Sequence, residues 1–138
     1  MEPKVYELKI AADTDKLPDV LAFVDPILEE NECSMKAVMQ IDVVLEELFV
    51  NIAHYAYPDG DGEAKINVIV DDENVEITLS DNGIPYDPLA KPDPDVTLSA
   101  EDRAIGGLGI YMSKKLMDDI SYQYSGGKNI LTIKKNIK

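Results

Sequence analysis

Two polar residues, Glu47 and Asn51, have the spacing to act together on one face of a helix. They are four residues apart in a segment whose apolar residues recur at helical spacing, so their side chains project about 40° from each other. His54 projects about 20° to the other side of Glu47. Because the segment is otherwise largely apolar, these groups lie at the edge of the core and need partners. A solvated helix face with an i, i+4 hydrogen bond is the alternative.

The segment Asp81-Asn82-Gly83-Ile84-Pro85 places a carboxylate away from water. Strand alternation puts Asp81 on the core side of its strand, together with Val75, Ile77 and Leu79. A buried anion needs a hydrogen-bond donor, from the protein or from a ligand. Gly83 lets a ligand or a backbone approach closely, although an ordinary turn accounts for a glycine there equally well.

The segment Gly106-Gly107-Leu108-Gly109 leads directly into a short predicted helix. Free amides at the positive end of a helix bind anions, and phosphate is the natural guest. Neither the Walker A pattern nor G-x-G-x-x-G is present, because Met112 stands at the sixth place counted from Gly107. A tight turn before a helix is the alternative interpretation.

A long helix and a central hairpin must position these groups. Ser34 or Asn31 can cap a helix whose apolar stripe runs to Tyr57-Pro58. Residues 66–70 and 75–79 alternate, which predicts an antiparallel hairpin at the centre of a sheet. The next segment, residues 84–105, has four prolines and no periodicity, and a loop of that length is typically a functional lid or disordered.

Elements at both ends of the chain complete two layers. Residues 4–10 alternate as a strand, and a helix follows in which Asp25-Pro26 predicts a kink or a break. Residues 110–117 form a short helix, and a last hairpin turns at Gly126-Gly127 between strands 120–124 and 129–133. Because helices and strands are segregated, we expect an α+β fold, a two-layer sandwich of helices on a mixed, largely antiparallel sheet.

Composition narrows the class of protein. The 138 residues include 45% hydrophobic and 29% charged residues, as in one ordinary globular domain spanning 1–138. A net charge of −14 argues against sequence-blind binding to nucleic acid or to anionic membranes. Cys33 and His54 are the sole residues of their types, which makes a disulfide or a zinc site improbable. No membrane span or signal-peptide pattern is visible, so we expect a cytoplasmic protein.

Taken together, Glu47-x-x-x-Asn51, Asp81-x-Gly83-x-Pro85 and Gly106-Gly107-x-Gly109 match a known arrangement. Over roughly residues 5–135 the chain resembles the ATP-binding domain shared by gyrase, heat-shock chaperones, sensor histidine kinases and mismatch-repair ATPases, the Bergerat fold. It is most similar to the stand-alone branch of anti-sigma-factor serine kinases. The resemblance implies a single histidine-kinase-like ATPase domain with ATP and Mg²⁺ as cofactors.

The resemblance also implies roles for the three groups. Asn51 resembles the magnesium ligand, and Glu47 is similar to the base that activates the attacking hydroxyl or water. Asp81 resembles the residue that reads adenine, with Gly83 leaving room for the ring. The phosphates would lie on Gly107, Leu108 and Gly109, under an ATP lid formed by residues 84–105.

Four positions depart from the family pattern or extend it. The branch often has a histidine four residues after the asparagine, but Tyr55 stands there, and we assign His54 no catalytic role. Arg103 could reach the phosphates from the lid. Thr132, on the last strand, could support the adenine site.

The function implied is that of a serine kinase that inhibits a sigma factor and phosphorylates a serine of an anti-anti-sigma partner of the STAS type. A module that binds ATP and sequesters a partner without phosphotransfer is the alternative. A third class is an acidic interaction domain that binds no nucleotide, with Asp81 satisfied by backbone amides. The sequence does not choose between a monomer and a homodimer.

Overall fold

The computed structural model describes residues 3–57, 62–89 and 107–137, without the side chains of residues 107 and 108. These residues contain five strands, three α-helices and two short helical turns. Their order is β1 (Lys4–Ala11), η1 (Thr14–Lys16), α1 (Leu17–Glu30), α2 (Met35–Asn51), η2 (Ile52–Ala56), β2 (Glu63–Val70), β3 (Asn74–Asp81), α3 (Gly107–Leu116), β4 (Asp119–Ser125) and β5 (Lys128–Asn136).

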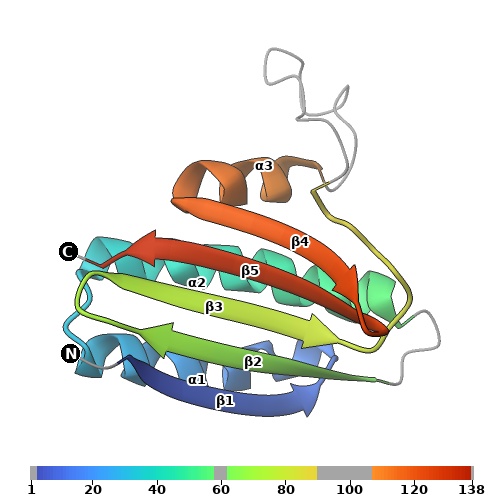
Figure 1. The fold of residues 1–138 in the computed structure, drawn as a ribbon, viewed down its shortest axis with the longest axis horizontal. Coiled ribbons are helices and arrows are strands. Elements are labelled where there is room, and N and C mark those ends of the chain that lie inside the picture. Colours follow the sequence, from blue (N-terminus) through green and yellow to red (C-terminus); the bar gives the residue numbers. More distant parts are fainter. Residues whose placement is uncertain (1–2, 58–61, 90–106, 138) are drawn as a thin grey trace.

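The strands form one sheet in the order β1-β2-β3-β5-β4, and all four pairings are antiparallel. Helices α1 and α2 lie behind the sheet in Figure 1, while α3 packs against α2 and β4. The other face of the sheet has no helix on it among the described elements (Figure 1). This arrangement confirms the predicted α+β sandwich of helices on a largely antiparallel sheet.

The core fills the space between the helices and one face of the sheet. Strand alternation turns the even positions of β2 and the odd positions of β3 inward, as the sequence predicts. These side chains form one cluster with the inward stripe of α2, whose fully buried members are Ile41, Val44, Leu45, Leu48 and Phe49. The polar end of this inward row is Asp81, the last residue of β3.

Helix α1 runs without a break through Pro26, so of the kink or break predicted at Asp25-Pro26 the break is wrong. The helix tolerates this proline because Pro26 lies on the exposed side, whereas Val24, Ile27 and Leu28 anchor both flanks in the core. Tertiary packing therefore outweighs the local cost of one lost backbone hydrogen bond.

Helix α2 begins where the sequence places a cap. The Ser34 hydroxyl accepts a hydrogen bond from the backbone N–H of Ala37 at 3.1 Å, which satisfies one of the donors at the helix start. At its other end α2 continues into the π-helical turn η2, a wider turn that is rare and often occurs at functional sites. No helix in the described ranges has both the length and the apolar character to cross a bilayer.

The last hairpin turns at Gly126 and Gly127, whose φ angles are 62° and 78°. Both values lie in the left-handed region, which a two-residue turn between antiparallel strands requires and glycine adopts without strain. The turn fixes the register of β4 and β5, so that Asn129 pairs with Tyr124 on one side and with Asp81 on the other.

Candidate functional site

Asp81 is buried at the end of β3 and is held by two donors. Its Oδ1 accepts hydrogen bonds from Nδ2 of Asn129 and from the backbone N–H of Gly83, each at 2.9 Å. The side chain is only 5% exposed, on the core side of the strand, as its alternation predicts. Burial raises the pKa of this carboxyl, and the bonds from Asn129 and Gly83 oppose that rise.

Oδ2 of Asp81 receives no hydrogen bond from any residue in the described ranges. The carboxyl borders a small hollow of about 10 Å³, which is lined mostly by apolar residues: Leu48 of α2, Ile52 of η2, Leu79 of β3, Leu131 of β5 and Pro88 of the loop after β3. That volume holds about one water molecule. Tyr86 and Pro88, which follow Gly83 in the chain, form the outer wall.

Gly83 lies directly against the end of the long helix. A Cβ atom at position 83 would collide with the backbone carbonyl of Ala56, in η2. The next residue, Ile84, donates its N–H to that carbonyl at 2.9 Å. The glycine is therefore needed for close approach of the loop to the helix backbone, which holds Asp81 at a fixed distance from α2.

Glu47 and Asn51 do form a pair. Nδ2 of Asn51 donates a hydrogen bond to Oε1 of Glu47 at 3.2 Å, one turn apart on α2. Gly109, in the first turn of α3, packs on the carboxylate of Glu47 so closely that a Cβ at position 109 would collide with it. The fold thus brings the glycine cluster and the Glu47–Asn51 pair to the same place. A helix start beside this pair is a favourable location for an anion.

The remaining glycine-cluster and lid positions are only partly described. Gly107 and Leu108 open α3. Residues 84–89 of the predicted lid are described, whereas residues 90–105 and Arg103 lie outside the described residues.

His54 and Tyr55 are both exposed, on the π-helical turn η2. Because the helix departs from α geometry after Asn51, the angular spacing that put His54 beside Glu47 does not continue there. The His54 ring instead meets the edge of Tyr55, and Tyr55 stacks on Tyr86 with ring centroids 4.9 Å apart. Burial raises the pKa of Tyr86 to about 12.

Asn129 lies against Asp81 although the sequence analysis did not name it, whereas Thr132, which it named, does not face Asp81. Thr132 lies on the opposite face of the sheet from Asp81, with its hydroxyl 3.3 Å from that of Thr78. Asn129 faces the core with Leu131 and Ile133, only 5% exposed. The alternation of this last strand, counted from its apolar residues, would have identified it.

Asn129 connects four parts of the site through one amide. Its Nδ2 donates to Asp81 and, at 2.8 Å, to the backbone carbonyl of Ile84. Its Oδ1 accepts from the backbone N–H of Tyr86 at 3.1 Å and from the Tyr122 hydroxyl. Every polar atom of the amide is therefore used, which fixes its orientation and that of the Asp81 carboxyl.

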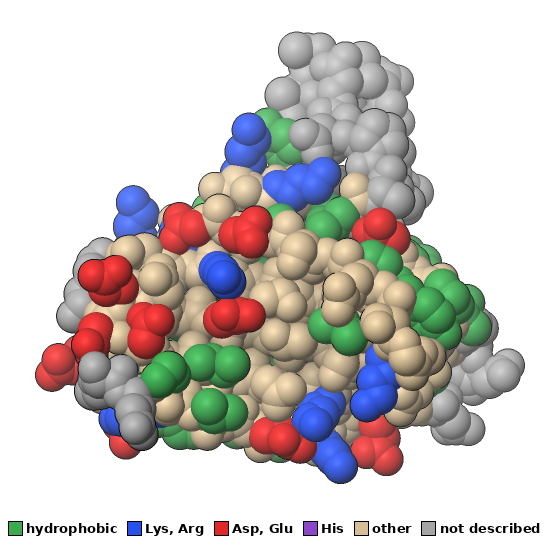
Figure 2. Space-filling view, viewed as in Figure 1, with side chains coloured by type: hydrophobic (Ala, Val, Ile, Leu, Met, Phe, Trp, Pro, Cys, Tyr) green, Lys and Arg blue, Asp and Glu red, His purple; other side chains and the backbone are tan. Residues whose placement is uncertain are grey.

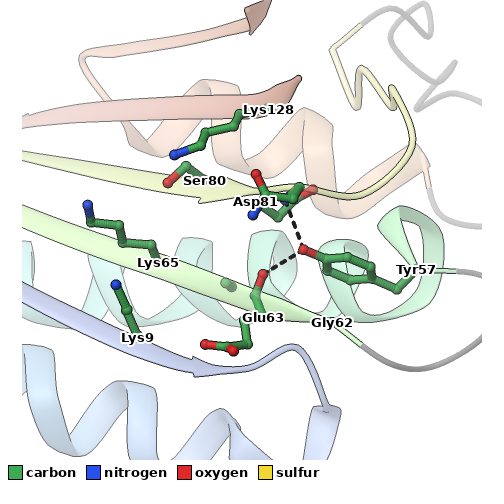
Figure 3. Close-up of a pocket in the computed structure, with 10 residues that line it drawn as sticks. Lys9, Tyr57, Gly62, Glu63, Lys65, Ser80, Asp81 and Lys128 are labelled. Carbon is green, nitrogen blue, oxygen red and sulfur yellow. Dashed lines mark hydrogen bonds between the residues drawn. The ribbon is translucent and has the colours of Figure 1, made fainter. Parts of the chain in front are cut away.

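Tyr57 ties the strand carrying Asp81 to the neighbouring strand. Its hydroxyl donates to the carbonyl of Glu63 at 2.7 Å and accepts from the N–H of Asn82 at 2.9 Å (Figure 3). The ring packs on Gly62, where a Cβ would collide with it. Burial raises the pKa of this phenol, which therefore stays protonated.

Known proteins are similar to this chain in sequence. Residues 10–135 match the family described as "Histidine kinase-like ATPase domain". Serine-protein kinase RsbW of Listeria monocytogenes serovar 1/2a is 28% identical over 106 residues, which cover 73% of this chain and 68% of that protein. Serine/threonine-protein kinase BtrW of Bordetella bronchiseptica is 27% identical over 135 residues, covering 96% of this chain and 94% of that protein.

A solved structure shows the same fold. The RsbU and RsbW domains of Rv1364c from Mycobacterium tuberculosis match with a TM-score of 0.66 at 16% identity, over 96% of this chain and 32% of that chain. The family match covers most of the present chain and includes Glu47, Asn51 and Asp81. The chain belongs to the family of histidine kinase-like ATPase domains.

Proposed function

We propose that this protein is an ATP-dependent serine protein kinase that acts as an anti-sigma regulatory factor. Its relatives of known name are serine and serine/threonine-protein kinases. The observation that carries the proposal is the Asp81 carboxyl, buried at the end of a core strand with Oδ1 fully engaged and Oδ2 facing no donor of the described residues. A purine amino group is a donor that suits such an acceptor.

The residues around Asp81 have the chemical character that adenine requires, but the hollow that they line is too small for its ring. Leu48, Ile52 and Leu131 supply apolar walls for a ring, and Asn129 fixes the carboxyl that would accept from its amino group. A hollow of about 10 Å³ cannot hold a purine. Binding of ATP therefore requires residues 84–89, with Tyr86 and Pro88, to move outward.

Asn51 is the residue we propose as a ligand of Mg²⁺. Its Nδ2 is bonded to Glu47, which leaves its carbonyl oxygen as the hard oxygen ligand that this ion prefers. The described residues contain no group of three acidic, histidine or cysteine side chains that could hold a metal ion. This suits Mg²⁺, which keeps several waters and usually takes few protein ligands, completed by phosphate oxygens. Bound there, the ion would neutralise charge on the phosphates.

Glu47 is the residue we propose as the general base. Asn51 donates to its Oε1 and Gly109 packs against the carboxylate, so the group is held at the start of α3. A serine hydroxyl of the partner that approaches this point can pass its proton to Glu47 as its oxygen attacks the γ-phosphorus of ATP, while the bond from that phosphorus to the β–γ bridging oxygen breaks and ADP leaves. The amides of Gly107, Leu108 and Gly109 would face the phosphates at the positive end of the helix.

The partners we propose are a sigma factor, which the kinase would inhibit, and an anti-anti-sigma protein of the STAS type, which would supply the serine. Phosphorylation of that serine would control which of the two partners is bound. The proposal places the protein in the cytoplasm, where both partners would occur.

Glu47→Gln tests the proposal against ATP binding without phosphotransfer. The variant should keep the affinity for ATP within about twofold and lose at least about 100-fold in transfer to the partner, because a general base contributes about 10²–10⁴ in rate. The measurement is transfer of the labelled γ-phosphate of ATP to a candidate STAS-type partner protein. Glu46→Gln, at the exposed neighbouring position, is the matched control and should leave transfer unchanged.

Transfer by Glu47→Gln at the parental rate would show that Glu47 is not the base. Absence of transfer by the parental protein, with ATP binding intact, would favour the partner-sequestering module instead.

A further inference from the structure

We propose that the open face of the sheet holds a second anion site, for a small ligand with two or more phosphoryl groups. A pocket of about 440 Å³ lies at the end of the sheet where β3 ends with Asp81 (Figure 3). Its lining includes three lysines and one serine hydroxyl, from Lys9, Lys65, Lys128 and Ser80, and also the two acidic residues Glu63 and Asp81. The pocket shares Asp81 with the hollow on the core side, but its other lining residues differ from those of the hollow.

Sheet register brings these four side chains together. Lys9 on β1 is directly opposite Lys65 on β2, and Lys65 is directly opposite Ser80 on β3. Lys128 begins β5 on the same face, since the alternate residue Asn129 faces the core. Figure 3 shows the three amines and the Ser80 hydroxyl extending in the same direction along the open face. Neighbouring strands lie about 4.8 Å apart, so this row can contact two anionic groups of one ligand.

The charges in this row are only partly balanced, since the three lysines share the pocket with the two acidic residues Glu63 and Asp81. Like charges directly opposite on neighbouring strands destabilise a sheet, and Lys9 faces Lys65 in this way. Lys65 pairs with Glu7 at 3.4 Å, but neither Lys9 nor Lys128 has an acidic side chain within ion-pair distance among the described residues. A bound anion would remove this repulsion.

The surrounding charge makes the lysine group distinctive. The chain has a net charge of −14, and in Figure 2 most acidic side chains of this face gather toward the end opposite the lysines. Grouped lysines on such a chain do not attract long polyanions in general, because the overall negative charge of the protein repels polyanions. Their effect is confined to a ligand small enough to lie within the pocket.

The lining favours a phosphorylated small molecule over an acidic protein surface. A volume of about 440 Å³ is within the usual range of about 300–1,000 Å³ for small-ligand pockets. Protein interfaces need buried aromatic or arginine anchors, yet Ala64 and the Tyr57 ring are the main apolar groups here. The hydroxyl of Tyr57 is already engaged by Asn82 and Glu63. Phosphoryl oxygens accept well from ammonium groups and from a serine hydroxyl.

The test is an NMR titration of the full chain with inorganic tripolyphosphate, with EDTA present. We expect the largest amide shifts at Lys9, Lys65, Ser80 and Lys128. The double variant Lys9→Gln/Lys128→Gln keeps the Lys65–Glu7 pair and should bind about tenfold more weakly, because each charge-assisted contact is lost. The single variants should each show a smaller loss, which keeps the test valid if the double variant is unstable.

Two control variants check that the lysines of this pocket bind the tripolyphosphate. Lys134→Gln removes an exposed lysine from the same face, near Glu76, and should leave tripolyphosphate affinity unchanged. Asn51→Ala, on α2 and outside the lining of this pocket, should also leave it unchanged while weakening binding of ATP with Mg²⁺, so failure here and failure of the kinase proposal are distinguishable.

Three results would overturn the proposal. The first is a set of shifts centred on the start of α3, which would place the ligand at the proposed ATP site. The second is an affinity that the lysine variants do not alter. The third is equally tight binding of a glutamate peptide of matched charge, which would indicate a surface for an acidic protein.

Discussion

Asp81 and Asp42 both have buried carboxyl oxygens, and their surroundings differ. Asp81 meets two donors, the Asn129 amide and the Gly83 N–H, so its charged form is held by hydrogen bonds. Asp42 on α2 instead faces Asp25 on α1, and Oδ1 of each is buried with no donor among the described residues. The pKa of Asp42 is raised to about 7. Burial is the largest cause, and the hydrogen bond to Asp25 and the negative charge of Asp25 raise it further.

The difference shows what donors contribute at a buried carboxyl. Amide donors keep a carboxylate charged and oriented, which makes it an acceptor that can recognise a ligand. A second carboxyl cannot do this, and at this contact the pKa of Asp42 is raised instead. Burial alone therefore does not indicate a binding site, whereas a buried carboxylate that amide donors orient beside a hollow is suited to accept from a ligand.

The largest expected effect is loss of the acceptor at Asp81. Asp81→Asn keeps the shape of the side chain but replaces the charged acceptor, and we expect ATP to bind about 100-fold more weakly, as for one lost hydrogen bond to a charged group. Calorimetry with ATP measures the change. Asp119→Asn, at an exposed position of β4, is the control and should bind ATP like the parental chain. An unchanged affinity in Asp81→Asn would remove the adenine assignment.

The next effect comes from the donor to Asp81. Asn129→Leu removes the amide that orients the carboxyl, so we expect about tenfold weaker ATP binding and a loss of about 1–3 kcal/mol in the free energy of unfolding. Denaturant unfolding and calorimetry give the two quantities. Thr132→Val, on the opposite face of β5, should change the affinity by less than about twofold. A similar loss of affinity in both variants would contradict the role assigned to Asn129.

The Asp25–Asp42 contact predicts an unusual dependence of stability on pH. The ordinary pKa of Asp42 is 3.8 and its pKa in the fold is about 7, so between these values the folded chain binds a proton that the unfolded chain releases. This contribution to stability is present at low pH and is lost as the pH rises through about 7.

Asp42→Asn should remove this pH dependence and supply a donor to Asp25. Allowing for solvent screening at this partly exposed position, we expect a gain of about 1 kcal/mol in the free energy of unfolding at pH 8. Urea unfolding at a series of pH values measures it. Asp19→Asn, exposed in the first turn of α1, should keep the parental slope. A lower stability of Asp42→Asn at pH 8 would show that the pair is not repulsive.

The smallest expected effect concerns the wall over Asp81. Tyr86→Ala removes the ring that stacks on Tyr55 and lines the hollow, so opening costs less and ATP should bind about threefold more tightly. Tyr124→Ala removes an exposed tyrosine from β4 and should leave the affinity for ATP unchanged. Weaker binding in Tyr86→Ala would indicate that the ring contacts the nucleotide instead of excluding it.

Most of the fold could be predicted because its signals are local and agree with one another. Alternation in β2 and β3 and the Ser34 cap all occur where the sequence indicates. The same alternation placed the Asp81 side chain correctly, since parity within one strand does not depend on the rest of the fold.

The predictions that failed depend on contacts across the molecule. The continuity of α1 through Pro26 reflects packing of its flanks, which no local pattern reports. The π-helical turn that redirects His54 and Tyr55 has no composition signal of its own. Asn129 has a local signal in the alternation of β5, but its pairing with Asp81 depends on β3 and β5 being neighbours.

The narrow hollow beside Asp81 also affects how fast the protein can respond to nucleotide. Residues 84–89 must swing away before a purine can enter, so the opening step precedes binding. In stopped-flow mixing with a fluorescent ATP analogue, the observed association rate should level off at high concentration, at the rate of opening, and not rise linearly. The timing of the response would then be set by this segment of the chain and not by the supply of ATP.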